Sequence, residues 1–232
     1  MQIFVLNLKH SIARKEFMRT QMLNLGLDYE FVEAIDGRLL NDKKGRLRSL
    51  VSDKYAFRCG GRPLTNAEFG CALSHLFVYQ TIVNRKIPYA IILEDDVSLG
   101  LAFDLFVKNL IQIQKLDWEL INLVSKTPSI PYGEIVFDIY RFSKFTEASN
   151  GAGAYCLKLS AAEKLLGYAY PVRFSADDLI GNSMDIGVNL CGILPEFVAW
   201  NDAFQSEIGS RHFHVSILSK QTKYPNSRYL CD

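Results

Sequence analysis

The sequence predicts an α/β fold, with a mostly parallel sheet that carries helices on both faces. Short apolar runs typical of buried strands alternate with amphipathic helical patterns through the first half of the chain. The composition is that of a globular protein, with 49% hydrophobic and 22% charged residues. At 232 residues the chain is long enough to bury a core without disulfide bonds. We therefore expect a single domain over residues 1–232, with an irregular C-terminal third.

The first half has clear start and stop signals. Strands are predicted at 2–8, 29–35 and 89–93, and helices at 11–25 and 65–85. Ser11 is placed to cap the first helix and Gly26 to end it. Thr65 and Glu68 form a capping box at the start of the second helix, which ends before Pro88. Segment 41–62 has no regular pattern, and its length predicts a loop that closes over a ligand. Its arginines are Arg46, Arg48, Arg58 and Arg62.

The second half is less regular. We expect a helix at 102–114, strands at 119–124, 154–159 and 193–200, and loops with a short hairpin at 127–147. Ser160 and Glu163 have the spacing of a second capping box, which predicts a helix to about residue 168. The last thirty residues show little pattern.

Charge and cysteine content narrow the class of protein. The 26 Lys and Arg residues nearly balance the 25 Asp and Glu residues, and the net charge of +1 argues against a nucleic-acid-binding domain. The five cysteines are odd in number and include no C-x-x-C, so neither a disulfide framework nor a zinc cluster is expected. The chain shows no signal-peptide pattern and no apolar run of about 18 residues, so we expect a cytoplasmic protein.

The C-terminus mixes basic and aromatic side chains. These are Lys220, Lys223, Tyr224, Arg228 and Tyr229. The mixture is typical either of a solvated tail or of a segment that rests on anionic lipid, which would put the protein at the inner face of the cytoplasmic membrane. His212 and His214 alternate nearby, and the sequence offers too few further nitrogen and sulfur ligands to predict zinc there.

The most informative segment is the acidic run Glu94-Asp95-Asp96, which closes a buried strand. Ligand sites of open α/β sheets lie at the carboxyl ends of strands. Alternation along the strand predicts that Glu94 and Asp96 share a face while Asp95 points away. Two carboxylates about 4 Å apart repel by about 4 kcal/mol at an effective dielectric of about 20, and a divalent cation removes that cost. Because oxygen ligands suit Mg²⁺ or Mn²⁺, the run predicts a metal–diphosphate site, with a solvated acidic turn as the alternative.

Other nucleotide and hydrolase motifs are absent from the sequence. The first strand leads into Asn7-Leu8-Lys9-His10 with no G-x-G-x-x-G, and no G-x-x-x-x-G-K-[ST] occurs. Dehydrogenases and P-loop enzymes are therefore disfavoured. The chain also has neither G-x-S-x-G nor H-E-x-x-H.

Four motifs follow one another along the chain. They are N-L-x-x-S-x-x-R at 7–14, A-x-D-G at 34–37, E-x-G-C-x-x-S-H at 68–75 and the acidic run at 94–96. Their order and spacing resemble glycosyltransferase family 25, the bacterial lipooligosaccharide glycosyltransferases and their collagen-modifying relatives. A fifth match, Gly153-Ala154-Tyr155, extends the resemblance to about residue 180.

The resemblance implies a GT-A type fold with a Rossmann-like sheet. Residues 1–125 would form the nucleotide-sugar half and residues 126–232 the acceptor half. The donor would be a UDP-sugar, usually UDP-galactose, with Mn²⁺ or Mg²⁺ as cofactor. Carried over, Asp96 and Glu94 are the metal residues, and Glu94 or Asp95 holds the ribose or a metal-bound water.

The resemblance also implies a nucleotide pocket. Its residues would be Asn7, Leu8, Arg14, Ala34, Asp36 and Gly37. For Arg14 the alternative is a surface ion pair, and for Asp36-Gly37 a plain turn. Ser74 and His75 are either donor contacts or, for His75, a satisfied core residue.

Asp177 and Asp178 are the candidate catalytic bases, at the start of a short predicted helix. The resemblance places the base in this stretch, and we prefer Asp178. In an inverting reaction, which here would form a β-linkage, a carboxylate deprotonates the attacking hydroxyl on the opposite face of the sugar. A helix cap is the alternative role for these residues.

The predicted function is transfer of a hexose, galactose by the habit of the family, from a UDP-sugar to a lipooligosaccharide glycolipid. Two alternatives remain open. A metal-dependent phosphoesterase would use clustered Asp at strand ends, but it normally needs more metal ligands than the sequence offers. A non-catalytic nucleotide-sugar-binding protein would keep the pocket and lack a working base.

Overall fold

The computed structural model describes residues 1–40, 50 and 62–204. Its centre is an eight-stranded sheet in the order β2-β1-β3-β8-β5-β9-β7-β6. In chain order the strands are β1 (Gln2–Leu8), β2 (Glu30–Ala34), β3 (Tyr89–Glu94), β5 (Leu120–Asn122), β6 (Ser129–Phe137), β7 (Tyr140–Phe145), β8 (Ala154–Lys158) and β9 (Leu190–Leu194). A separate antiparallel pair joins β4 (Val97–Leu99) to β10 (Val198–Trp200).

Most strands of the large sheet run in one direction. β1 is parallel to β2 and β3, and β5 is parallel to β9. β8 is antiparallel to both β3 and β5, so these two point the same way. β7 is antiparallel to β9 and β6 is antiparallel to β7. Thus β1, β2, β3, β5, β6 and β9 share a direction and only β7 and β8 oppose it, which confirms the predicted α/β fold.

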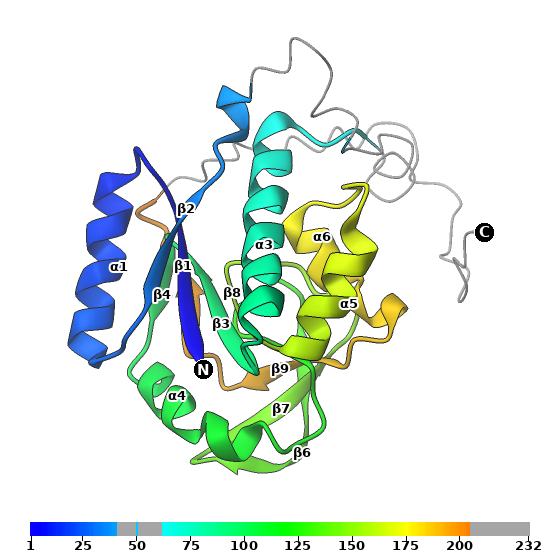
Figure 1. Ribbon diagram of the computed structural model, residues 1–232. Coiled ribbons are helices and arrows are strands. Elements are labelled where there is room, and N and C mark those ends of the chain that lie inside the picture. Colours follow the sequence, from blue (N-terminus) through cyan, green and yellow to red (C-terminus); the bar gives the residue numbers. More distant parts are fainter. Residues whose placement is uncertain (41–49, 51–61, 205–232) are drawn as a thin grey trace.

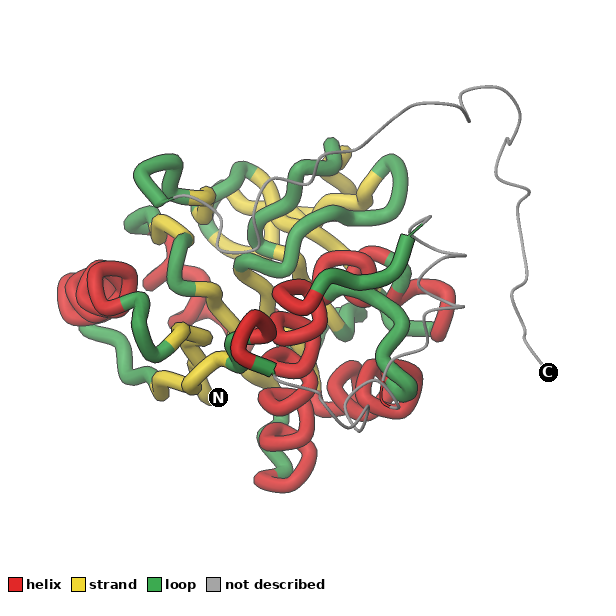
Figure 2. The backbone as a smooth tube through the Cα atoms, turned by 90° about the horizontal axis from the view of Figure 1, so that it is seen from above, coloured by secondary structure: helices red, strands yellow, loops and turns green. Residues whose placement is uncertain are grey.

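Helices cover both faces of this sheet (Figures 1 and 2). The helices are α1 (Ile12–Leu25), α3 (Asn66–Arg85), α4 (Ala102–Ile113), α5 (Leu159–Ala169) and α6 (Ala176–Gly181), with short 3-10 turns η1 (Gly37–Leu39) and η3 (Ser183–Ile186). α3, α5 and α6 pack on one face and α1 and α4 on the other. Alternation along β3 supplies both cores, because Ile92 faces the first and Ile91 the second.

Three sequence expectations in the second half are corrected. β6 and β7 form a full hairpin at the edge of the main sheet, which the exposed and irregular pattern of β6 concealed. α5 begins at Leu159, one residue before the expected capping box, and the Ser160 hydroxyl instead donates to Glu119 at 2.6 Å. The expected last strand is divided between β9 and β10, with Pro195 between them.

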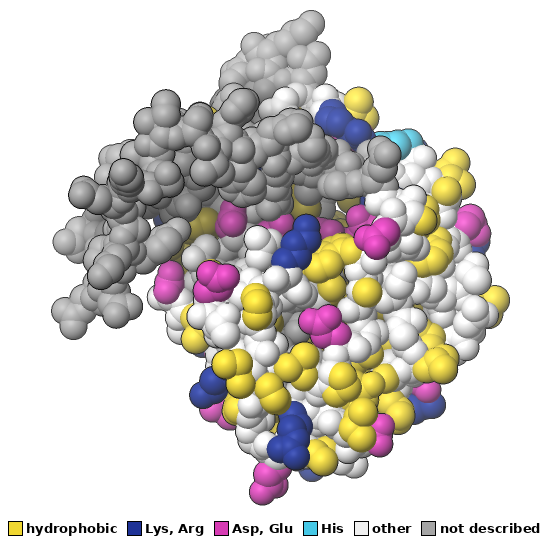
Figure 3. All heavy atoms as spheres, turned by 180° about the vertical axis from the view of Figure 1, so that it is seen from behind, with side chains coloured by type: hydrophobic (Ala, Val, Ile, Leu, Met, Phe, Trp, Pro, Cys, Tyr) yellow, Lys and Arg dark blue, Asp and Glu magenta, His cyan; other side chains and the backbone are white. Residues whose placement is uncertain are grey.

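Several expected features fall wholly or partly outside the described residues. They are the loop at 41–62 with Arg46, Arg48 and Arg58, the pair His212 and His214, and the basic-aromatic C-terminus. Arg62 is described and forms an ion pair with Glu68 at 2.6 Å. In the described part of the chain, no helix has the length and apolar character needed to cross a membrane. Lys and Arg side chains are scattered singly over the face seen in Figure 3.

The turn after β2 is fixed by a close contact between Gly37 and Gly70. A Cβ atom on Gly70 would collide with the backbone of Gly37, and one on Gly37 would collide with the Asn66 carbonyl. Because neither glycine has a side chain, this turn can lie directly on the first turns of α3. The same contact fixes the carboxyl end of β2 relative to α3.

We predict that Gly70→Ala lowers the free energy of unfolding by at least about 1–3 kcal/mol, because the backbone of η1 must move to admit the methyl group. Gly167→Ala is the matched control, since Gly167 lies in helix α5 and a Cβ there meets open space. That substitution should raise the free energy of unfolding by up to about 1 kcal/mol. Urea denaturation measures both. Equal effects in the two variants would contradict the close contact.

Candidate functional site

A pocket lies where β1, β2 and β3 end side by side. The β1 and α1 side contributes Leu6, Leu8 and Arg14. The segment after β2 contributes Ala34, Ile35, Asp36, Gly37 and Arg38. α3 contributes Ala67, Cys71, Ser74 and His75, and the end of β3 contributes Glu94, Asp95 and Asp96. Residues from all four sequence motifs thus meet in one pocket at the carboxyl edge of the parallel strands.

Arg14 joins two of the carboxylates. Its side chain is 9% exposed, and Nη1 donates to Asp95 Oδ1 at 2.9 Å and to Asp96 Oδ2 at 3.2 Å. Asn7 does not line the pocket, but its Nδ2 donates to Asp95 Oδ2 at 2.7 Å. Arg14 is therefore a buried ion-pair partner, and the surface ion pair considered from the sequence is wrong. The expectation that Glu94 and Asp96 share a face is also wrong. Asp96 joins Asp95 at Arg14 of α1, whereas Glu94 pairs with His75 of α3, because β3 ends at Glu94 and alternation stops there.

Among the three carboxylates of the acidic run, Asp96 has the least compensation of its negative charge by hydrogen bonds and ion pairs. Its Oδ1 atom is buried and accepts no hydrogen bond from the described residues. Burial and the nearby charge of Glu94 raise the pKa of Asp96 to about 6, against the lowering effect of Arg14. Burial also raises the pKa of Asp95, although the hydrogen bonds from Arg14 and Asn7 oppose this. A buried oxygen without a partner is expensive, so this atom is suited to an external ligand.

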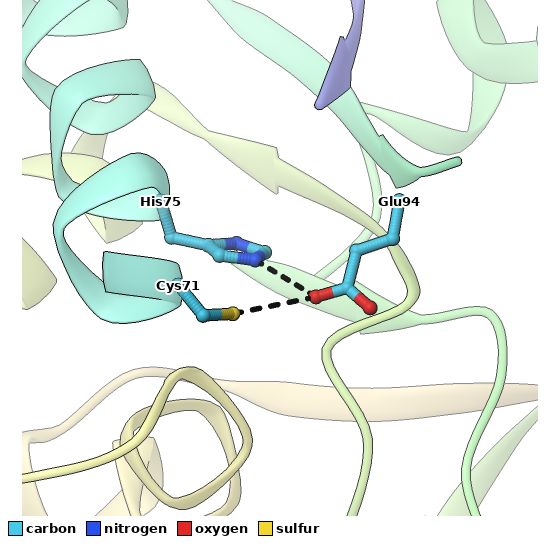
Figure 4. A group of neighbouring side chains, drawn as sticks. All are labelled: Cys71, His75 and Glu94. Carbon is cyan, nitrogen blue, oxygen red and sulfur yellow. Dashed lines mark hydrogen bonds and ion pairs between the residues drawn. The ribbon is translucent and has the colours of Figure 1, made fainter. Parts of the chain in front are cut away.

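Glu94 points toward Cys71 and His75 of α3 (Figure 4). Its Oε1 lies 3.1 Å from His75 Nε2 and 3.7 Å from Cys71 Sγ. Burial alone would raise the pKa of Glu94, but the hydrogen bond and charge of His75 outweigh it and the pKa is lowered. His75 Nδ1 in turn lies 2.7 Å from the Tyr155 hydroxyl, which contacts the Tyr79 hydroxyl at 2.9 Å. His75 is thus both a buried, hydrogen-bonded residue and part of the pocket wall.

Ser74 and Asp36 have structural partners as well as pocket positions. The Ser74 hydroxyl accepts from the Ile35 backbone N–H and donates to the Gly70 carbonyl, both at 2.8 Å. Asp36 accepts from the Arg38 backbone at the start of η1. The hydrogen bond from the Arg38 guanidinium lowers the pKa of Asp36 despite partial desolvation. These residues hold the end of β2 against α3.

Asp177 and Asp178 do not line this pocket. Asp177 Oδ1 accepts a hydrogen bond from the Ala152 N–H at 2.8 Å. The carbonyl of Gly153, which follows Ala152, accepts a hydrogen bond from the Glu94 N–H at 2.7 Å. Asp178 Oδ2 accepts from the Ser175 hydroxyl at 2.7 Å in the first turn of α6. Asp177 therefore braces the segment beside Glu94, and Asp178 is an exposed carboxylate at a helix start.

The sequence motifs and this geometry agree with a comparison to known families. The model of glycosyltransferase family 25 (LPS biosynthesis protein) matches residues 1–180. The chain belongs to glycosyltransferase family 25.

Two similar proteins differ in the activity that their names describe. Procollagen galactosyltransferase 1-B of Xenopus laevis is 33% identical over 171 residues, which cover 71% of this chain and 28% of that protein. A probable inactive glycosyltransferase 25 family member 3 of Bos taurus is 32% identical over 178 residues, covering 74% of this chain and 29% of that protein. The alignments thus span less than a third of the length of these relatives.

Among solved structures, the inositol-1-phosphate CTP transferase from T. maritima has a TM-score of 0.45 and 9% identity. The match covers 86% of this chain and 87% of that one.

Arg38 and Cys71 line the pocket of this family 25 chain but were not singled out from the sequence as site residues. For Cys71 a signal existed, because it lies four residues before His75 and so shares its helix face. For Arg38 the signal was weaker, since it lies in the turn after Asp36-Gly37.

We predict that Asp96→Asn stabilises the folded protein at neutral pH in metal-free buffer. The folded-state pKa of about 6 lies above the ordinary value of 3.8, so the ionised carboxylate opposes folding. The penalty is absent below about pH 4 and develops as the pH rises through about 6, to at most about 3 kcal/mol. Urea denaturation at about pH 7.5 should therefore show a gain that disappears near pH 4.

Asp28→Asn is the control, because Asp28 is an exposed aspartate outside the pocket. It should change the free energy of unfolding by less than about 0.5 kcal/mol at either pH. A loss of stability in Asp96→Asn at neutral pH would contradict the assigned cost of this carboxylate.

Proposed function

We propose that the chain is a glycosyltransferase that moves galactose from UDP-galactose to a sugar of a lipooligosaccharide glycolipid, with a divalent metal and with inversion. Membership of family 25 and the similarity to proteins named procollagen galactosyltransferases support this proposal. The observation that carries it is the buried, unpartnered Oδ1 of Asp96 in a pocket at the ends of three parallel strands. Ligands of α/β sheets bind at such strand ends.

The residues of the acidic run fit the metal that the proposal requires. Asp96 offers an oxygen with no partner among the described residues, which is the donor type that Mn²⁺ and Mg²⁺ prefer. Asp96 would hold the ion. Glu94, the second metal residue expected from the sequence, is instead held by His75 on α3. When bound, the ion would stabilise the negative charge on the leaving diphosphate.

The remaining pocket residues would bind and orient the donor. Arg14 keeps Asp95 and Asp96 together and offsets part of their charge, so the donor diphosphate approaches a less negative surface. Ala34 and Gly37 line the pocket at the end of β2, where the small side chain of Ala34 would let a nucleotide approach the backbone. Arg38 is partly exposed at the same edge and is placed to contact an anionic or polar group of the donor.

Asp178 is our candidate for the general base. An exposed carboxylate at the start of α6 can accept a proton from an acceptor hydroxyl that enters from solvent. Asp177 is less suited because one oxygen already holds the Ala152 N–H. The acceptor half is proposed as residues 126–232, with the basic-aromatic C-terminus against anionic lipid on the cytoplasmic side of the membrane.

A non-catalytic nucleotide-sugar-binding protein is the second candidate. It is favoured by the relative whose name describes it as a probable inactive family member, at 32% identity. Such a protein would bind the nucleotide-sugar donor without transferring the sugar. Both candidates therefore predict donor binding, and only the transferase predicts turnover.

We predict that Asp96→Asn reduces galactose transfer at least about 100-fold while the protein stays folded, because the unpartnered carboxylate oxygen is lost from the donor site. The measurement is transfer of radiolabelled galactose from UDP-galactose to lipooligosaccharide with Mn²⁺. Asp28→Asn should keep the activity of the unsubstituted chain. Near-normal transfer by the Asp96 variant would show that the metal role is wrong.

We predict that Asp178→Asn lowers kcat by about 100- to 10,000-fold with little change in UDP binding, as expected on loss of a general base. Asp177→Asn should instead lower the free energy of unfolding, because the Ala152 N–H loses a charged acceptor. Steady-state kinetics with calorimetric UDP binding separate the two effects. Equal losses of turnover and of UDP binding in Asp178→Asn would mark that residue as structural.

A further inference from the structure

We propose that Cys71, His75 and Glu94 form a site for a thiophilic divalent cation such as Zn²⁺, in the pocket wall and distinct from the oxygen site at Asp96. Among the described His, Cys, Asp and Glu side chains, these three bring one donor atom each to within 4.8 Å of one another. They supply a sulfur, an imidazole nitrogen and a carboxylate oxygen (Figure 4). The sequence alone predicted no zinc cluster, because the cysteines are odd in number and include no C-x-x-C.

The distances suit a tetrahedral ion. Oε1 of Glu94 lies 3.1 Å from His75 Nε2 and 3.7 Å from Cys71 Sγ. Around zinc, with bonds of about 2.0 Å to nitrogen and oxygen and about 2.3 Å to sulfur, tetrahedral donor atoms are separated by about 3.3–3.5 Å. Since all three donors lie within 4.8 Å of one another, side-chain movements of about 1 Å would bring them to this spacing.

The fold holds these donors in place. Cys71 and His75 are one helical turn apart on α3, so their side chains share a face. Glu94 ends β3, where its backbone N–H donates to the Gly153 carbonyl at 2.7 Å. Two elements of regular structure thus supply all three ligands, which limits the entropy lost when an ion binds.

His75 has the supporting partner that metal-bound histidines usually have. Its Nδ1 lies 2.7 Å from the Tyr155 hydroxyl, which lies 2.9 Å from the Tyr79 hydroxyl. With Nε2 bound to the metal, Nδ1–H would donate a hydrogen bond to the Tyr155 hydroxyl. The Tyr155 hydroxyl would in turn donate a hydrogen bond to the Tyr79 hydroxyl. Such partners fix the ring orientation and the tautomer. The two tyrosines are buried, so water does not compete for these hydrogen bonds.

The site is open on one side. Cys71, His75 and Glu94 all line the pocket, which gives an ion an entry path and leaves a fourth position for water or an oxygen of a bound molecule. A thiolate and a carboxylate neutralise the two positive charges. The sulfur and nitrogen donors favour Zn²⁺ over Mg²⁺ or Mn²⁺, which separates this site chemically from the one at Asp96.

Titration of the whole chain with Co²⁺ tests the proposal without any donor sugar, so its result is independent of the proposed transferase function. One equivalent of Co²⁺ should bind with an intense near-ultraviolet thiolate-to-cobalt absorption, and one equivalent of Zn²⁺ should abolish it. Cys59 and Cys231 lie outside the described residues, so the Cys59→Ser/Cys231→Ser double variant is the background control and must keep the absorption.

In that background Cys71→Ser should lose the absorption and bind Zn²⁺ more than about 100-fold more weakly. Tyr155→Phe should retain the absorption and bind Zn²⁺ about 10- to 100-fold more weakly, because only the support of His75 is lost. Asp96→Asn is the matched control and should retain the absorption. Thermal unfolding verifies that each variant is folded. Absorption that survives Cys71→Ser, or stoichiometric Co²⁺ binding without any such absorption, would overturn the site.

Discussion

The buried ion pair between Arg14 and the turn Asp95-Asp96 is the interaction on which the site depends. It joins α1 to the end of β3 and puts one positive charge against two carboxylates, while Asn7 satisfies the far oxygen of Asp95. Glu94 is compensated separately, by His75 on α3. The one buried carboxyl oxygen left without a partner among the described residues of this run is Asp96 Oδ1. The structure thereby concentrates its uncompensated negative charge at one point in the pocket.

This arrangement implies a conflict between stability and function. A pKa of about 6 means that ionised Asp96 opposes folding at neutral pH. Replacing a carboxylate that only Arg14 compensates would be the simple route to a more stable protein. Retention of such a group is understandable if a cation and a diphosphate supply the missing charge. The opposite wall, with Cys71, His75 and Glu94, is hydrogen-bonded to the core through Tyr155 and does not carry the same penalty.

The sequence predicted the fold class and the location of the pocket, because both depend on local patterns. Apolar runs gave the strands, the capping box at Thr65 gave the start of α3, and strand ends of a parallel sheet meet at one edge. The sequence could not predict the directions of the site side chains. These depend on the residue at which a strand ends and on contacts between residues far apart in the sequence. Asp96 was expected to share a face with Glu94, but β3 ends at Glu94 and Asp96 pairs with Arg14 instead. The pairing of Glu94 with Cys71 and His75 joins residues about twenty positions apart. The exposed strand β6 lacked the alternation that marks a strand, so only a short hairpin was expected there.

The central claim is that a cation and a nucleotide diphosphate meet at Asp96. The most direct test is a crystal structure of the chain with Mn²⁺ and UDP, using the anomalous scattering of manganese to locate the ion. The account predicts an anomalous peak at bonding distance from Asp96, about 2.0–2.3 Å, with the diphosphate beside it at the ends of β1 and β3. Well-ordered UDP bound away from this pocket, or in it with no manganese near Asp96, would contradict the account.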